Sequence, residues 1–112
     1  MQEIINLIAK AQEELSKDNT SPREISDYLY KMSASIYPLG QKMIEADKAY
    51  SQQWLNLRSE LATDAQAEKK GKTLPEYAVR QSLEYLMKTL IQCIQSLKKR
   101  LLIMSEEKNN QY

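Results

Sequence analysis

Apolar residues recur every three or four positions between Thr73 and Glu106, and the rest of the chain is arranged around this stretch. The recurring positions are Leu83, Met87, Leu90, Ile94, Leu97, Leu101 and Met104. This spacing places them on one helix face, in a stripe of three heptads that needs an equally long partner. Thr73 is a capping residue, with Pro75 and Glu76 in the first turn. The pattern therefore predicts a long helix over residues 74–106.

A second stripe supplies that partner. It consists of Ile25, Leu29, Met32, Ile36, Leu39, Met43, Ala46, Tyr50, Trp54, Leu57 and Leu61, after a capping box at Ser21, Pro22 and Glu24. Pro38 and Gly40 interrupt it, and a helix break there is the simpler interpretation. However, the apolar steps continue in register across the interruption, which a loop would have no reason to preserve. We therefore predict one helix over residues 22–62, kinked near Pro38.

The remaining segments are shorter. Ile4, Ile8, Ala11 and Leu15 predict an amphipathic helix over residues 2–17. Residues 63–72 contain no large apolar side chain, which favours a frayed helix end followed by an exposed hairpin loop ending at Gly71. Folding the two long helices together over that loop places Tyr50 opposite Met87. The expected fold is all-α: a single domain over residues 1–112, formed by a three-helix antiparallel bundle with a long helical hairpin.

Charge and composition narrow the classes of function that the chain could have. The chain has 16 basic and 15 acidic residues, whereas proteins that grip a phosphate backbone usually have a marked basic excess. Two basic clusters still allow nucleic-acid contacts, with a solvated loop and a helix end as the alternative explanation. The clusters are Lys69, Lys70 and Lys72, and Lys98, Lys99 and Arg100.

The sequence lacks the usual residues of catalysis. It contains no histidine, so the commonest general base and the commonest transition-metal ligand are both missing. Its single cysteine, Cys93, borders the Ile94 stripe and is expected to be a small buried apolar residue. We therefore expect no enzyme activity, no catalytic residues, no cofactor and no metal. One cysteine, no leader and no membrane-length apolar run favour a cytoplasmic protein.

The aromatic residues are seven tyrosines and Trp54. Tyrosine suits half-exposed and partner-contacting positions, because it combines a wide apolar face with a polar tip. Tyr30 and Tyr37 are seven residues apart and lie off the main stripe, so they share another face of the helix. That face either packs against the first helix or forms a docking surface.

Further apolar residues flank the two long stripes. They are Ile44, Leu55, Val79, Leu86 and Ile91. Two helices alone leave such flanks partly exposed to solvent, and an apolar band on a small protein usually marks an interface. The band predicts either a homodimer that forms a four-helix layer or the site where another protein docks.

Three segments resemble a group of small helical bacteriophage proteins, which are often encoded near phage recombination and single-strand-binding genes. They are the Glu45–Tyr50 run, the Thr73–Ala78 helix start and the residues from Tyr85 to Leu101. The resemblance covers residues 25–112 and supplies no catalytic residues. It implies a phage accessory factor in the bacterial cytoplasm that binds a protein partner. The partner is a phage recombination or replication component, or a host defence complex such as a CRISPR effector that the protein inhibits. A nucleic-acid-binding accessory protein is the alternative.

Overall fold

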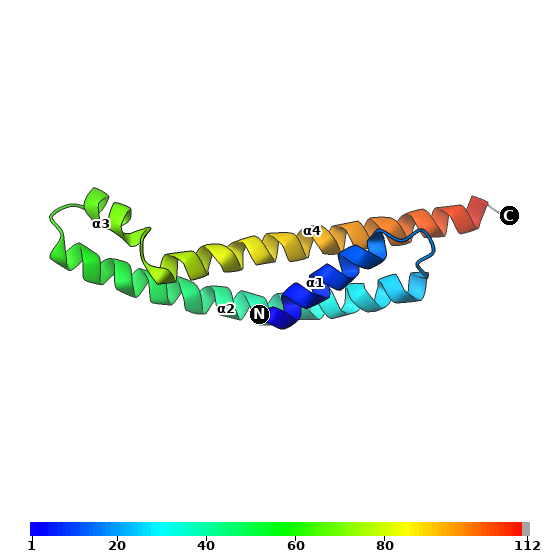
Figure 1. The fold of residues 1–112 in the computed structure, drawn as a ribbon, viewed down its shortest axis with the longest axis horizontal. Coiled ribbons are helices and arrows are strands. Elements are labelled where there is room, and N and C mark those ends of the chain that lie inside the picture. Colours follow the sequence, from blue (N-terminus) through cyan, green and yellow to red (C-terminus); the bar gives the residue numbers. More distant parts are fainter. Residues whose placement is uncertain (111–112) are drawn as a thin grey trace. The chain divides into compact units, whose positions relative to one another are not determined.

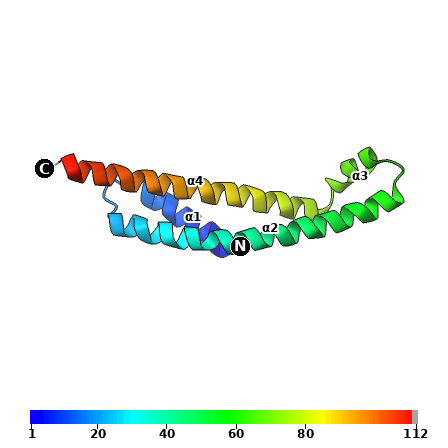
Figure 2. The ribbon, with the colours of Figure 1, turned by 180° about the vertical axis from the view of Figure 1, so that it is seen from behind.

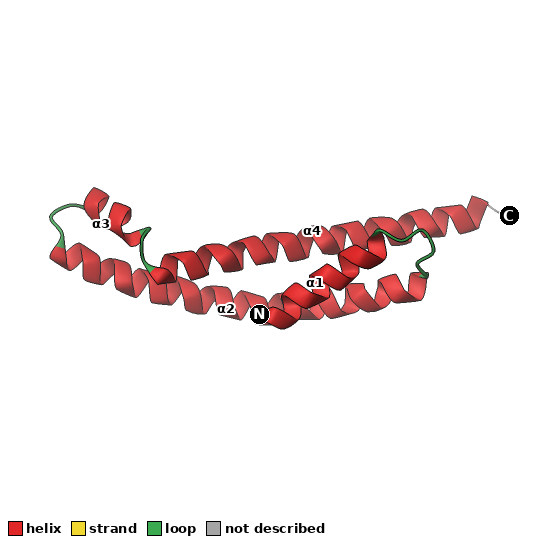
Figure 3. Ribbon diagram, viewed as in Figure 1, coloured by secondary structure: helices red, strands yellow, loops and turns green. Residues whose placement is uncertain are grey.

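The computed structural model describes residues 1–110, and its regular structure is entirely helical in that part of the chain (Figures 1 and 3). The helices are α1 (Gln2–Leu15), α2 (Pro22–Glu60), α3 (Asp64–Gly71) and α4 (Pro75–Asn110). The predicted all-α class is confirmed, but the count is wrong, because the described residues form four helices instead of three. No helix among them has the length and apolar composition needed to cross a bilayer.

α2 runs without a break through Pro38. Proline lacks an N–H donor and its ring crowds the preceding turn. Burial of apolar residues before and after Pro38 must therefore compensate for the lost hydrogen bond. Met32 and Leu39, seven residues apart, are both fully buried. At the start of the helix, Ser21 Oγ accepts a hydrogen bond from Glu24 N at 3.2 Å, as the capping box predicts. The prediction of one continuous helix over this stretch is confirmed.

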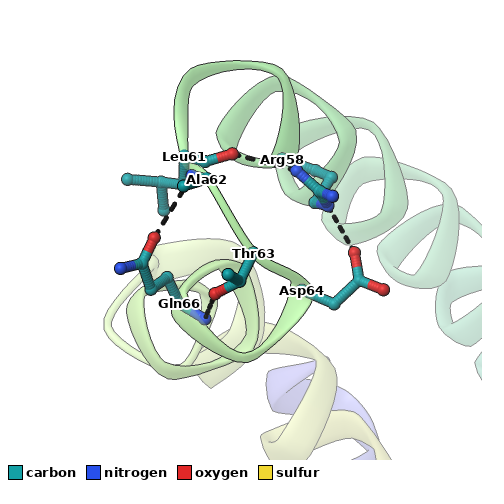
Figure 4. A network of polar contacts seen from close by, with 6 residues as sticks. All are labelled: Arg58, Leu61, Ala62, Thr63, Asp64 and Gln66. Atoms are coloured by element: carbon teal, nitrogen blue, oxygen red, sulfur yellow. Dashed lines mark hydrogen bonds and ion pairs between the residues drawn. The ribbon is translucent and has the colours of Figure 1, made fainter.

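The frayed helix end and hairpin loop expected over residues 63–72 are instead a separate helix, α3, so that prediction is wrong (Figure 4). Thr63 caps the helix, with its Oγ1 accepting a hydrogen bond from Gln66 N at 3.2 Å. Arg58 of α2 pairs with Asp64 and also donates to the Leu61 carbonyl oxygen at 2.9 Å. The buried residues of α3 are Ala67 and Gly71, and neither has a large side chain. Small residues allow α3 to lie close to its neighbours, so no bulky apolar group is needed.

Two compact units divide the chain. The first combines Met1–Tyr37 with Met87 and the residues after it, so it contains α1, the start of α2 and the C-terminal part of α4. α1 lies beside both of those helix segments (Figures 1 and 2). The core of this unit consists of Ile8, Ala11, Ile25, Met32, Leu90, Cys93, Ile94 and Leu97. Burial of Leu90, Ile94 and Leu97 confirms the stripe predicted for this part of α4.

The second unit, Pro38–Leu86, contains the rest of α2, α3 and the start of α4. Leu39, Ala46, Ala67 and Leu83 are buried in it. The predicted pairing of its two long helices is wrong. Tyr50 packs against Tyr77 with 5.6 Å between ring centroids, ten positions before the expected Met87. The shift arises because α3 turns back along the C-terminal end of α2. α4 therefore begins opposite residues that lie further from that end of α2 than a simple hairpin loop would place them.

Candidate protein-interaction surfaces

Arg80 of α4 is the centre of a polar cluster that joins α4 to α2 in the second unit. Its Nε atom lies 3.0 Å from Asp47 Oδ1 and 3.4 Å from Glu84 Oε1. Its guanidinium carbon lies 5.0 Å from the centroid of the Tyr50 ring. Partly exposed ion pairs contribute about 0–1 kcal/mol each, and an exposed cation–π contact about 0.5–1 kcal/mol. Arg80 thus fixes which side of α4 faces Asp47 and Tyr50, a role that the sequence did not reveal.

The outer face of α2 in the second unit carries Ile44 and Leu55, which are 49% and 62% exposed. These two residues are at either end of a shallow hollow of about 650 Å³, and every lining residue belongs to α2. The other lining residues are Asp47, Lys48, Ser51, Gln52 and Asn56. We call this surface the α2 outer face. It combines two exposed apolar side chains with polar groups of both charges, as partner-binding surfaces do.

Leu55 also borders a second hollow of about 600 Å³. The remaining lining residues are Tyr50, Ser51, Trp54, Glu68, Lys72 and Arg80. Its lining includes two aromatic, one acidic and two basic side chains. Arg80 already pairs with Asp47 and Glu84, and Glu68 adds a negative charge near Lys72 in the same lining, so the hollow has little net positive charge for a phosphate. This hollow suits an apolar or mixed side chain of a protein partner better than a nucleic acid.

The structure separates the other residues of the predicted apolar band. Val79, 54% exposed, lines a different hollow of about 300 Å³ together with Ala46, Ala49, Pro75 and Glu76. Leu86 is half-buried. Ile91 belongs to the first unit and is 42% exposed there. The structure thus brings Ile44 and Leu55 into one shared hollow and places Val79 in another.

Tyr30 and Tyr37 lie on α2 in the first unit and are among its most exposed large side chains. The two residues are 78% and 74% exposed. Side chains this exposed do not pack against α1, so the packing alternative from the sequence is excluded. The two rings instead present an open aromatic face, with room for a partner to cover both.

The basic residues are divided between the two units. Lys69, Lys70 and Lys72 are exposed in and just after α3, whereas Lys98 and Lys99 are exposed on α4 in the first unit. Arg100 is half-buried, and its Nη2 donates a hydrogen bond to the Lys17 carbonyl oxygen at 3.1 Å. Arg100 thus satisfies a backbone acceptor just after α1, which limits its use for a phosphate.

Cys93 is 4% exposed, as expected for a small apolar core residue. Burial raises the pKa of its thiol, because the charged thiolate loses hydration inside the unit. A thiol with a raised pKa and little access to solvent is a poor nucleophile. Cys93 therefore serves packing in the first unit.

The chain matches no protein-family model, no curated protein and no solved structure.

Proposed function

We propose that this chain is a non-enzymatic interaction protein that binds a protein partner through Tyr30 and Tyr37. The observation that supports this proposal most strongly is the exposure of these two residues, at 78% and 74%. They lie two helical turns apart on one face of α2, so a single partner surface can cover both rings. Tyrosine is enriched at protein interfaces because it buries a large apolar area and keeps a hydroxyl group available.

The resemblance to small phage proteins supports a phage accessory factor as the biological setting. In that setting the partner is a component of phage recombination or replication, or a host defence complex such as a CRISPR effector. A protein partner is favoured over a nucleic acid, because the chain carries a net charge of only +1 and Arg100 is engaged with Lys17. The same surface test applies to either kind of protein partner.

The test is affinity capture from phage-infected bacteria with the tagged chain, followed by binding measurements with the purified partner. A Tyr30→Ala, Tyr37→Ala double variant should bind at least about tenfold more weakly, since truncating one central aromatic residue of an interface often costs about 2 kcal/mol. Tyr85→Ala is the matched control, because Tyr85 lies in the second unit and is 74% exposed. Circular dichroism should show unchanged helix content in all variants.

Two outcomes would contradict the proposal. One is a partner whose affinity is the same for the double variant and the unmodified chain. The other is an equal loss of affinity in the Tyr85→Ala control, which would show that the loss is not specific to the Tyr30 and Tyr37 face.

A further inference from the structure

We infer that the Tyr30 and Tyr37 face of α2 binds an arginine side chain of the protein partner, which lies over Ala34 between the two rings. This assignment rests on the proposed function and adds the chemistry that the partner presents to that face. Three features support it: a backbone carbonyl oxygen without its usual donor, two exposed aromatic rings and a nearby carboxylate.

Pro38 leaves one carbonyl oxygen of α2 without its usual hydrogen bond. In an α-helix each carbonyl oxygen accepts a hydrogen bond from the N–H group four residues further on. For Ala34 that residue is Pro38, which has no N–H group. Ala34 and Pro38 are both exposed, so a group from outside the helix can reach this oxygen. A regular helix supplies no donor to it, and water or a partner has to supply one.

The two tyrosine rings flank this acceptor. Positions 30, 34 and 37 are separated by four and then three residues, which places them on one side of the helix. Tyr30 and Tyr37 are about 10.5 Å apart along the helix axis, and Ala34 between them has only a methyl group as its side chain. The small residue leaves space between the rings. A partner side chain that enters this space also reaches the Ala34 oxygen.

The charges around the rings suit a cation. Asp27 is exposed one turn before Tyr30, and its carboxylate forms no ion pair with another residue in the described part of the chain. The other charged residues between positions 22 and 37 are Arg23, Glu24 and Lys31, so this stretch has no net charge. Lys31 follows Tyr30 directly and is turned from it by about 100° around the helix axis. The carboxylate of Asp27 is therefore the charge in line with the rings.

Arginine satisfies all three features at once. Its planar guanidinium group stacks on aromatic rings, and its five N–H donors allow it to stack and to donate to the Ala34 oxygen together. Lysine carries the same charge, but its ammonium group is compact, strongly hydrated and unable to stack. A carboxylate or phosphate would meet two groups that repel it, the Ala34 carbonyl oxygen and the Asp27 carboxylate. An apolar side chain would leave the Ala34 oxygen without a donor.

A peptide titration tests the site without the partner. The probe is acetyl-Gly-Gly-Arg-Gly-Gly-amide, added to the isotope-labelled chain while NMR spectra follow the backbone amide signals of α2 and the tyrosine ring signals. The unmodified chain should show saturable shifts at Tyr30, Ala34 and Tyr37, with a dissociation constant in the millimolar range. Peptides with lysine or citrulline in place of arginine should bind at least about threefold more weakly, because the first cannot stack and the second has no charge.

Pro38→Ala tests the carbonyl oxygen directly. The substitution supplies the N–H group that the Ala34 oxygen lacks and leaves both tyrosines and Asp27 in place. The affinity for the arginine peptide should fall at least about threefold, since a hydrogen bond to a charged donor is lost. Gly40→Ala is the matched control, because it also favours the helical state of α2 but provides no donor for Ala34. Its affinity for the peptide should equal that of the unmodified chain.

Two further variants test the other features. The Tyr30→Ala, Tyr37→Ala double variant should abolish the shift of the Ala34 amide signal, because both stacking surfaces are removed. Asp27→Asn should weaken peptide binding by about two- to threefold, as expected for one exposed charge pair. Circular dichroism checks that each variant keeps its helix content.

Three results would overturn the inference. They are an absence of shifts at the highest peptide concentration, an equal affinity for the lysine peptide, and equal affinities of Pro38→Ala and Gly40→Ala. None of them contradicts the proposed function if the Tyr30→Ala, Tyr37→Ala variant still loses affinity for the protein partner. Conversely, a partner that binds this double variant normally, while the arginine peptide shifts the signals of the unmodified chain, would contradict the proposed function alone.

Discussion

At the scale of single residues, the two glycines of the chain serve different purposes. Gly40 lies inside α2, and a Cβ atom added there would have no neighbour within 4 Å. Gly71 ends α3, and a Cβ atom added there would lie 3.0 Å from Tyr50 Oη and 3.3 Å from Trp54 Cδ1. Neither glycine has a positive φ, so any demand for glycine comes from space alone. Only at Gly71 would an added side chain press against its neighbours.

This contrast gives a paired prediction. Gly40→Ala should raise the free energy of unfolding by about 0.5–1 kcal/mol, because alanine loses less backbone entropy in a helix interior. Gly71→Ala should show no such gain, since the added methyl group must displace the Tyr50 hydroxyl or the Trp54 ring. Denaturant unfolding of both variants gives the free energies, and Trp54 fluorescence should change only for Gly71→Ala. Equal stabilisation of both variants would show that α3 does not approach these rings closely.

The apolar pattern predicted most core residues but not the side chains at its margins. Leu83, Leu90, Ile94 and Leu97 are buried as the heptad spacing indicates. Ile36, assigned to the stripe of α2, is 38% exposed, whereas its neighbour Ser35 is half-buried. Both positions lie about 50° from the line between Met32 and Leu39, on opposite sides of it. Spacing alone therefore does not decide which of the two faces inward.

At the scale of helices, α3 is the element that sequence reasoning missed. The search for large apolar residues fails there, because α3 packs through Ala67 and Gly71. A local signal was nevertheless present. Thr63 followed by Gln66 is a capping-box pair, and both side chains accept backbone hydrogen bonds at this junction. A helix held by small residues is thus better recognised from its cap than from its hydrophobic pattern.

Because α3 was not predicted, the predicted contacts between α2 and α4 were also displaced. A frayed helix end and loop in place of α3 predicts Met87 as the partner of Tyr50, whereas the observed partner is Tyr77. The Asp47–Arg80 ion pair depends on the observed pairing, so the sequence did not predict it. For the same reason Ile44 and Val79 were assigned to one band, whereas they line separate hollows. In these cases the sequence indicated the chemical character of each side chain, but not which side chains it contacts.

The exposed lysines of α3 lead to a prediction about nucleic acids. We expect no specific DNA binding by the unmodified chain at moderate salt, because Glu68 lies beside Lys69 and the net charge is only +1. Fluorescence anisotropy with single- and double-stranded DNA at several salt concentrations measures this. If the lysines did bind phosphates, replacing Lys69, Lys70 and Lys72 with alanine would reduce the salt dependence by about three contacts. Such a reduction, absent from a Lys98→Ala, Lys99→Ala control, would contradict the expectation.

At the scale of the whole molecule, two continuous helices contribute to both compact units. α2 and α4 each begin in one unit and end in the other. Unfolding one unit alone would end both helices in mid-length, leaving backbone groups unpaired at each new end. Helix formation is cooperative, so ending a helix internally is unfavourable. The shared helices are therefore expected to couple the folding of the two units.

The chain carries one natural probe in each unit. Trp54, its only tryptophan, lies in the second unit, and Cys93, its only cysteine, lies in the first. Trp54 fluorescence should respond when α3 separates from the Tyr50 and Trp54 rings, which lie next to Gly71. Cys93 should react with a thiol reagent only after the first unit unfolds, because burial both shields the sulfur and raises its pKa.

We predict that both probes report the same unfolding transition. In a denaturant series, the midpoint of Trp54 fluorescence should coincide with the midpoint of Cys93 labelling and with loss of helical circular dichroism. The physical reason is the coupling through α2 and α4, which leaves no low-energy state with one unit folded. Labelling of Cys93 at a denaturant concentration that leaves Trp54 fluorescence unchanged would show that the first unit opens alone. The converse result would show that the second unit, with α3, opens first, and either result would mean that the continuous helices do not transmit folding between the units.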